Sequence, residues 1–312
     1  MMFIIKYKKI FVSVSIVLVF LSVLSLFIFG LNVGIDFRGG TLAEIVYHDG
    51  ERPAQEILNK DLEALNFGTI LLQPTGELGY IVKSRSLNDD EHIQLLKTLS
   101  QNEKNSLTEI SFNSIGPSVG RELTRKAILA IVLVSLAIIC FIAFAFRKVS
   151  HLSALGRQGV ASWRYGLIAI VTLLHDVTIP IGIFATLSHY YGVEIDTLFV
   201  VAVLTILGLS VSDTIVIFDR IRENLKNQSN SKNINFGEIV GNSLDQSYVR
   251  SISTSLTVIL VLLALVFFGP ISTKYFAFML TAGMFFGTYS SIFLASPLLV
   301  LIEEWQKKKQ QV

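Results

Sequence analysis

The chain has 312 residues, of which 52% are hydrophobic and only 16% are charged, and its mean hydropathy is +0.60. A soluble fold of this size cannot bury so much apolar surface, so the composition excludes an ordinary soluble protein and indicates a membrane protein. The formal net charge of +2 is unevenly placed, because residues 36–122 hold 14 acidic and 8 basic side chains while the remainder is basic. Two compartments with different partners are therefore expected.

The first predicted element is an uncharged apolar stretch over residues 10–31, which follows a short tail, residues 1–9, containing Lys6, Lys8 and Lys9. This order of charges also occurs in signal peptides. A cleavable signal has an apolar core of roughly 7–15 residues. Because the present stretch is longer, we expect a retained membrane helix.

A compact α+β domain is predicted over residues 32–126. Alternating or helical spacing of apolar residues predicts a strand over 41–47, a helix over 53–65, strands over 69–72 and 80–82 around a glycine-containing turn, a helix over 88–99 and a strand over 107–112. This order is that of a ferredoxin-like split βαβ unit. Such a fold is a common binding scaffold and says little about function.

Five more apolar stretches follow the domain, each about as long as the 20 residues that cross a membrane. They cover residues 127–146, 165–189, 197–218, 250–268 and 275–302. Loops are predicted over residues 147–164 and 219–249, the second with a short helix on the membrane surface. The chain closes with a tail over residues 303–312.

Basic side chains gather on one side of this six-span arrangement, in the two tails and the two loops. They are Lys6, Lys8, Lys9, Arg147, Lys148, Arg157, Arg164, Arg220, Arg222, Lys226, Lys232, Lys307, Lys308 and Lys309. Because short basic connections tend to stay in the cytoplasm, both termini are expected there and the α+β domain on the opposite side.

Two aspartates inside predicted spans are the first candidates for function, because an Asp at the centre of a membrane helix costs roughly 2.5–3.5 kcal/mol by insertion scales. Asp176 lies near the middle of the third span, beside His175 and one turn before Pro180. The missing amide of the proline frees the carbonyl of Asp176, and this local break could admit water. The alternative is a neutral, hydrogen-bonded packing residue.

Asp213 lies in the inner half of the fourth span among Ser210, Ser212 and Thr214, whose hydroxyls could hold a protonated acid or relay a proton. Its alternative is a purely structural role. Arg250 opens the fifth span on the side where the fourth ends, so it could hold Asp213 ionised. It could equally extend to the lipid headgroups. The hydroxyl of Thr254, one turn after Arg250, is a possible accessory group.

The remaining polar groups favour structural roles. Asp219 and Arg220 fall where the fourth helix should leave the membrane, which favours interfacial ion pairs. His175 and Asp176 are adjacent, hence on different helix faces, and make a poor metal pair. The single cysteine, Cys140, lies in an apolar run, where we expect a small buried hydrophobic residue and no multi-cysteine metal site.

Five segments, in chain order, resemble motifs of the SecD/SecF family of protein-export membrane proteins. They are residues 34–41 (GIDFRGGT), 114–123 (SIGPSVGREL), 174–177 (LHDV), 212–224 (SDTIVIFDRIREN) and 250–255 (RSISTS). The motif glycines are Gly34, Gly39, Gly40 and Gly116, of which Gly39 and Gly40 suit a tight turn after the first span. The similarity extends from the first span to the last, and the separate short chain points to the SecF members.

The resemblance implies a six-span half-transporter of the RND superfamily that pairs with a six-span SecD and associates with the SecYEG channel, with YajC and YidC as further partners. It implies late export of a translocating polypeptide across the bacterial inner membrane, driven by the proton gradient, with no enzymatic activity, cofactor, metal or nucleic acid. By position, Asp213 matches the family's intramembrane acid implicated in proton conduction, and Arg250 matches the arginine near it. Asn often precedes that acid in the family, whereas Ser212 stands here.

The expected mechanism is a conformational cycle in which protonation of Asp213 weakens its attraction to Arg250 and the external domain moves to hinder backsliding of the polypeptide. Three alternatives remain. An RND-type small-molecule exporter would need a larger external domain, an intramembrane hydrolase would need a nucleophile with a facing base, and a purely structural subunit could use every motif for assembly.

Overall fold

The computed structural model of the chain describes residues 1–48, 52–146, 162–227 and 235–310. It divides into two compact units, each with its own core. One unit comprises Met1–Asn32 and Ala130–Val312, and the other comprises Val33–Leu129. Arg147, Lys148, Arg157 and Lys232, which contributed to the expected orientation, lie outside the described residues.

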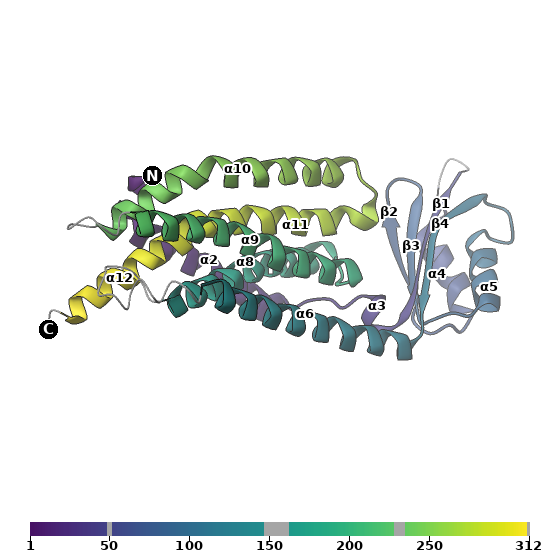
Figure 1. The fold of residues 1–312 in the computed structure, drawn as a ribbon. Helices are drawn as coiled ribbons and strands as arrows, with labels where there is room; N and C mark the ends of the chain where they lie inside the picture. Colours follow the sequence, from purple (N-terminus) through teal and green to yellow (C-terminus); the bar gives the residue numbers. More distant parts are fainter. Residues whose placement is uncertain (49–51, 147–161, 228–234, 311–312) are drawn as a thin grey trace. The chain divides into compact units, whose positions relative to one another are not determined.

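The first unit is a bundle of long helices (Figure 1). Its elements are α1 (Met2–Lys6), α2 (Lys8–Phe29), the larger part of α6 (Pro117–Phe146), α8 (Ser162–Tyr191), α9 (Thr197–Asn227), α10 (Phe236–Phe268), α11 (Ile271–Ser290), the π-helical η2 (Ser291–Ala295) and α12 (Ser296–Gln310). In the described residues, six helical stretches are long and apolar enough to cross a membrane, the last formed by α11, η2 and α12 together. The six-span prediction is confirmed, and the chain is a multi-pass membrane protein.

The helices extend beyond the apolar stretches that revealed them. α6 begins at Pro117, a residue suited to the first position of a helix, ten residues before the expected start of the span. The short surface helix expected before the fifth span is not separate, because residues 236–249 form the first part of the continuous α10. One face of that part carries Phe236, Ile239, Val240 and Leu244, which are buried in the core of the bundle.

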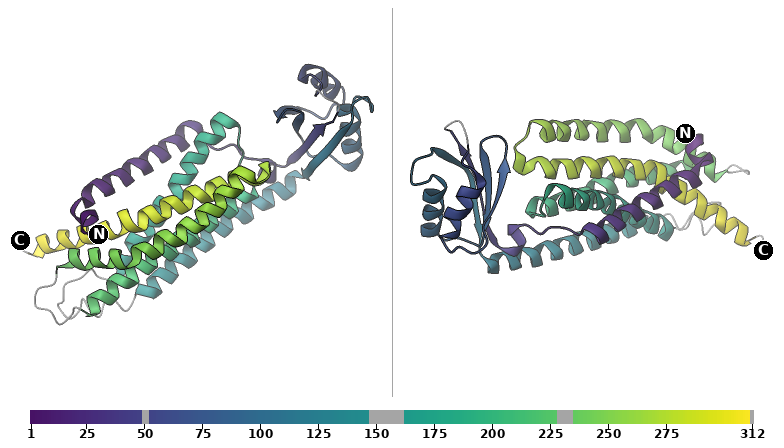
Figure 2. Two further views of the ribbon diagram at one scale, coloured as in Figure 1. Left: turned by 90° about the horizontal axis from the view of Figure 1, so that it is seen from above. Right: turned by 180° about the vertical axis from the view of Figure 1, so that it is seen from behind.

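Glycines bring pairs of helices close together. A Cβ added at Gly182 of α8 would lie 2.4 Å from the Cβ of Ser22 on α2, and one added at Gly283 of α11 would lie 2.3 Å from Ile206 on α9. Figure 2 shows α2 running beside α8. The hydrophobic effect does not drive helices together in a membrane, so helices associate there through close packing, which small residues permit.

Three helices bury little of their surface within the chain. In the apolar 18-residue stretch of each helix, only 11% is buried in α2, 6% in α6 and 11% in α10. These faces are left for lipid or another membrane chain. Cys140 on α6 is exposed for this reason, so the expectation that it is buried is wrong.

The first and last helices, α1 and α12, lie at the same end of the helical bundle (Figures 1 and 2). Ile4 and Ile5 of α1 are buried in the core that the other helices form. Lys8 forms an ion pair with Glu304 of α12. The amino-terminal segment is therefore packed into the bundle and joins its α10 and α12 helices.

The second unit is a small α+β domain with a four-stranded sheet. Its elements are α3 (Ile35–Arg38), β1 (Gly40–Tyr47), α4 (Gln55–Glu63), β2 (Leu71–Thr75), β3 (Gly79–Ser84), α5 (Asp89–Leu99) and β4 (Leu107–Ile115). The strand order is β2-β3-β1-β4, and every neighbouring pair is antiparallel. This is the predicted ferredoxin-like arrangement.

Alternation along the strands builds the core of this domain. Ala43, Ile45 and Tyr47 of β1 are buried with apolar residues of α4 and α5. The Tyr47 hydroxyl donates a hydrogen bond to the carbonyl of Leu99 at 2.9 Å. Burial is the main cause that raises the pKa of Tyr47, and the nearby Tyr80 adds to it. At the start of α5, Asn88 caps the helix as part of a capping box that two hydrogen bonds close.

Candidate functional site

Asp176, near the middle of α8, lies at the centre of a buried polar cluster. Its side chain is fully buried. The Nδ1 atom of His175 lies 2.8 Å from its Oδ1, the Ser290 hydroxyl donates to its Oδ2 at 2.7 Å, and the Ser210 hydroxyl also donates to Oδ2. The carboxyl group thus joins α8 to α9 and α11. His175 and Asp176 share a hydrogen bond although they are adjacent, so the expectation that they face apart is wrong.

The local backbone around this cluster is irregular. Pro180 lies inside α8, and its missing amide leaves the carbonyl of Asp176 without the regular helical bond. On α11, Ser290 is the last residue before the π-helical η2. Single π-helical turns are frequent at functional sites. The hydroxyl of Ser291, the first residue of η2, lies 2.8 Å from that of Thr214 on α9.

Close packing of α9 on α11 brings these groups within reach of one another. A Cβ added at Gly287 of α11 would lie 3.3 Å from the Cβ of Ser210. Gly283 lies one turn earlier against Ile206. Side chains at these two positions would press on Ser210 and Ile206, so the glycines allow the close approach of α9 and α11 where Ser210 and Ser290 bind the same carboxyl group.

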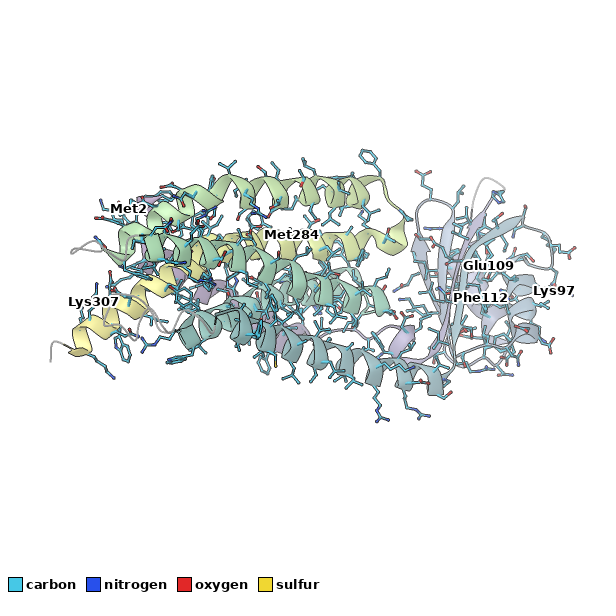
Figure 3. All side chains as sticks on the ribbon, in the orientation of Figure 1. Met2, Lys97, Glu109, Phe112, Met284 and Lys307 are labelled. Atoms are coloured by element: carbon cyan, nitrogen blue, oxygen red, sulfur yellow. The ribbon has the colours of Figure 1, made fainter. Side chains whose placement is uncertain are left out.

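Asp213 lies one turn after Ser210 on α9, and its carboxyl group is not satisfied. Its Oδ2 atom is buried and makes no hydrogen bond with any described residue. The group borders a small cavity, with about 10 Å³ open to the centre of a water molecule, that is lined by Leu209, Ser210, Asp213, Ser255, Gly283, Met284, Gly287 and Thr288. Met284 marks its place on α11 in Figure 3. A space of this size holds about one water molecule.

Arg250 lies close enough to Asp213 for their charges to interact, but the two side chains do not form an ion pair. The two side chains interact through their charges, while Arg250 itself is exposed. No ion pair of 4 Å or less joins them among the described residues. Ser251 approaches the Asp213 carboxyl, yet its buried hydroxyl makes no hydrogen bond of acceptable geometry with a described residue.

The other predicted residues lie outside the cluster. Ser212 is exposed, and the hydroxyl of Thr254 donates to the Arg250 carbonyl of its own helix at 2.9 Å. Asp219 and Arg220 are exposed near the end of α9. There, Arg220 pairs with Glu223 at 2.8 Å and Asp219 pairs with Arg222 at 3.4 Å.

Sequence reasoning missed the contribution of α11. Ser290 binds Asp176, and the Thr288 hydroxyl donates to that of Ser255 at 2.5 Å across the α10–α11 contact. The available signal was the row of small residues at helical spacing along α11, from Gly283 and Gly287 to Ser290. Ser210 was noticed, but as a partner of Asp213 rather than of Asp176.

The arrangement suits the holding and passing of protons. Carboxyl, hydroxyl and imidazole groups from three helices form a hydrogen-bonded chain in a site that is closed to bulk water. In the part of the chain that the structure describes, no three His, Cys, Asp or Glu side chains converge as metal ligands.

The glycine motif after the first span has a separate, structural explanation. Gly39 and Gly40 have φ values of 80° and 143°, which side chains rarely adopt. A Cβ at Gly120 would lie 2.8 Å from the Gly39 amide nitrogen, so the first two sequence motifs pack against each other. Gly34 is extended, and a Cβ at Gly116 would meet only the Ser118 hydroxyl at 4.0 Å.

Comparison with known proteins identifies matches along nearly the whole chain. The family model described as "Protein export membrane protein SecD/SecF, C-terminal" matches residues 95–157 and 160–305, and the one described as "SecD/SecF GG Motif" matches residues 24–49. The protein translocase subunit SecF of Thermobaculum terrenum is 42% identical, with 98% of this chain and 94% of that protein covered. The SecF of Anaerolinea thermophila is 34% identical, with 96% and 94% covered.

Solved structures agree. The crystal structure of SecDF from Thermus thermophilus, described as a translocon-associated membrane protein, is similar with a TM-score of 0.77 and 29% identity over 97% of this chain. A second SecDF structure, in a super-membrane-facing form, gives a TM-score of 0.67 and 30% identity over 98% of the chain. The present chain spans only 38% and 39% of those longer chains.

Proposed function

Because this chain belongs to the SecD/SecF family of protein-export membrane proteins and has a SecF-like role in protein translocation, we propose that it uses the proton gradient to assist the late stage of export. Its partners would be a six-span SecD, the SecYEG channel, and YajC and YidC. The pairing with SecD is supported by the protein translocase subunit SecDF of Bacillus subtilis, which is 31% identical over 97% of this chain, while this chain covers only 38% of that longer protein. The location would be the bacterial inner membrane, with both termini in the cytoplasm.

The observation that carries the proton-driven mechanism is the unsatisfied, buried carboxyl oxygen of Asp213 beside a cavity that fits about one water. An ionised carboxylate without a partner inside a membrane costs free energy. Binding a proton neutralises the group and removes that cost. Arg250 interacts with the charged form only. Protonation therefore releases the attraction between α9 and α10.

The available energy is adequate for such a switch. Moving one elementary charge across the membrane supplies about 2.3 kcal/mol per 100 mV. Two conformations that differ by a few kcal/mol can be interconverted by that amount. In the cycle, release of α10 from α9 lets the bundle rearrange, and the soluble domain then hinders backward movement of the emerging polypeptide.

The test replaces Asp213 with Asn and measures export of a secretory protein into inverted membrane vesicles that also contain SecD and SecYEG. Export stimulated by an imposed proton gradient should fall to the level seen with an uncoupler, because an amide cannot carry the proton. Asp219→Asn, an exposed acid six residues further on the same helix, is the matched control and should behave as wild type.

Assembly must be measured in the same membranes. If Asp213→Asn still co-purifies with SecD, a loss of gradient-dependent export reports proton coupling. If export by this variant stays fully gradient-dependent, the central role of Asp213 is wrong. Export that never responds to the gradient, in wild type or variant, would support a purely structural subunit.

A further inference from the structure

The mechanism above uses Asp213 and leaves unused the second acid of the bundle, Asp176, which is the more deeply buried of the two. We infer that the His175–Asp176 pair is a second proton-holding site, supplied from Asp213 through the hydroxyl of Ser210. This inference rests on the proposed function and adds a second station to the path.

The pair has room for one more proton. When Asp176 is ionised its oxygens only accept hydrogen bonds, so the hydrogen shared with His175 lies on Nδ1, and Nε2 carries a lone pair. His175 is 3% exposed, and its Nε2 atom is buried without a hydrogen-bond partner among the described residues. The ring stacks on Tyr289 at a centroid distance of 6.3 Å. A histidine that served only to fix structure would be expected to have both nitrogens satisfied.

Ser210 connects the two acids. Its hydroxyl donates to Oδ2 of Asp176, and its side chain lines the cavity that Asp213 borders. Ser210 and Asp213 are three residues apart on α9 and share a helix face. One water in the cavity would bridge the remaining gap, which matches the space available.

The transfer balances without any other reactant. Protonated Asp213 gives its proton to the cavity water, the water gives one to the Ser210 oxygen, and Ser210 gives its own hydroxyl proton to Oδ2 of Asp176. The water and the serine are restored, Asp213 becomes a carboxylate, and the His175–Asp176 pair has gained one proton. Arg250 is then attracted again to Asp213, which resets the first switch.

Charges around the pair favour this alternation. Among the described residues, His175 shares a hydrogen bond with Asp176, and Tyr289 of α11 stacks on the His175 ring. Asp213 of α9 interacts with Asp176 through its charge, and the charged group of α10 in this region is Arg250. Asp176 and Asp213 interact electrostatically, so the state in which both are negative is disfavoured. Two acids coupled in this way take up protons as a system rather than singly.

The experiment records pH-dependent infrared difference spectra of the full-length chain in lipid nanodiscs, in the region of the protonated carboxyl C=O stretch. Two buried carboxyl signals should respond to pH. Asp213→Asn should remove one and Asp176→Asn the other, while His175→Gln should shift the Asp176 signal. Glu303→Gln, which alters a third buried acid of the bundle, one that pairs with Lys307, is the matched control and should leave both signals in place.

The link is tested with Ser210→Ala. After a rapid pH jump, the Asp213 signal should respond as in wild type, whereas the Asp176 signal should respond more slowly. If the wild-type spectra contain no pH-dependent signal that Asp176→Asn removes or His175→Gln shifts, Asp176 is a packing residue and the inference is wrong. The His175→Gln spectrum decides the question even if Asp176→Asn does not fold.

The two proposals fail in different ways. Gradient-dependent export that survives in Asp213→Asn contradicts the proposed function, whatever the spectra show. Loss of that export, combined with an Asp176 signal that does not respond to pH, contradicts only the second proton-holding site at His175 and Asp176.

Discussion

At the scale of single residues, the two membrane acids differ in how their carboxyl groups are held. Asp176 accepts hydrogen bonds from Ser210 and Ser290, whereas a buried oxygen of Asp213 has no partner among the described residues. The presence of two costly acids in the third and fourth spans followed from their positions inside apolar stretches, and both lie in polar surroundings in the structure. The partners were harder to predict. Ser210 and Ser212 both neighbour Asp213 in sequence, but one is buried on Asp176 and the other is exposed, because successive helix positions turn by about 100°.

A prediction at this scale concerns Arg85 and Glu91 at the start of α5. Two hydrogen bonds of 3.0 and 2.5 Å join the guanidinium and the carboxylate, and mainly this partner lowers the pKa of Glu91 below its usual value of 4.5. A lowered pKa in the folded state means that the pair stabilises the domain above pH 4.5 and loses this effect as the pH falls through the folded-state pKa. Arg85→Ala should therefore destabilise the domain at neutral pH but not at low pH.

The measurement is urea unfolding of the soluble domain as a function of pH, followed by the fluorescence of its tyrosines. Arg52→Ala is the matched control. Arg85 lies over the ring of Phe67, and Arg52 likewise lies over that of Tyr80, but the hydrogen bonds of Arg52 go to the carbonyls of Gly76 and Gly79. Its effect should be independent of pH over this range, and an equally flat profile for Arg85→Ala would disprove the role of the Glu91 pair.

At the scale of elements, the sequence indicated where helices exist but not how closely they approach. The apolar stretches located six spans because length and hydropathy are local properties. The continuity of α10, the π-helical η2 and the tight contacts of α8 and α11 depend on neighbouring helices. The sequence around a glycine does not show whether it lies at a helix contact or faces lipid, so these contacts could not be predicted.

Gly182→Ala and Gly208→Ala should differ in stability, because Gly182 lies at a tight helix contact and Gly208 does not. At Gly182 a new Cβ would lie 2.5 Å from the Cα of Ser22, so the backbones of α2 and α8 must move apart. This overpacking should cost about 1–3 kcal/mol. At Gly208 on α9 the new Cβ meets nothing within 4 Å, so the change should be neutral or stabilising by up to about 1 kcal/mol.

Reversible unfolding of both variants in mixed detergent micelles measures the difference. Gly182→Ala should also weaken the hydrogen bond that Ser25 donates to the Gly182 carbonyl, now 2.8 Å long. Equal stability of the two variants would mean that the α2–α8 contact can relax without cost.

At the scale of the whole molecule, composition predicted two parts with opposite charge, and the chain does form two compact units. The segment of residues 36–122, which holds the excess of acidic groups, lies within the α+β unit. The bundle carries the basic side chains of α1 and α12, and these two helices lie at the same end of it (Figure 1). In the proposed topology, the positive-inside rule assigns this basic end to the cytoplasm.

That orientation can be measured with single cysteines placed in a Cys140→Ser background. Lys97→Cys, on the exposed side of α5 (Figure 3), should react with a membrane-impermeant thiol reagent in intact spheroplasts. Lys308→Cys, near the end of α12, should react only after the membrane is opened, because short basic segments stay in the cytoplasm. The reverse pattern would overturn the proposed topology.

The sequence by itself determined the class of protein, the six membrane helices, the ferredoxin-like order of strands and helices, and the presence of buried acids. Each of these follows from the length, period or cost of a local stretch of residues. Only the tertiary structure decided that Asp176 is held by Ser210 and by Ser290, which is 114 residues away, and that Asp213 is left beside a cavity. Such contacts depend on the rotation and separation of packed helices, which small residues set and which no single segment of sequence contains.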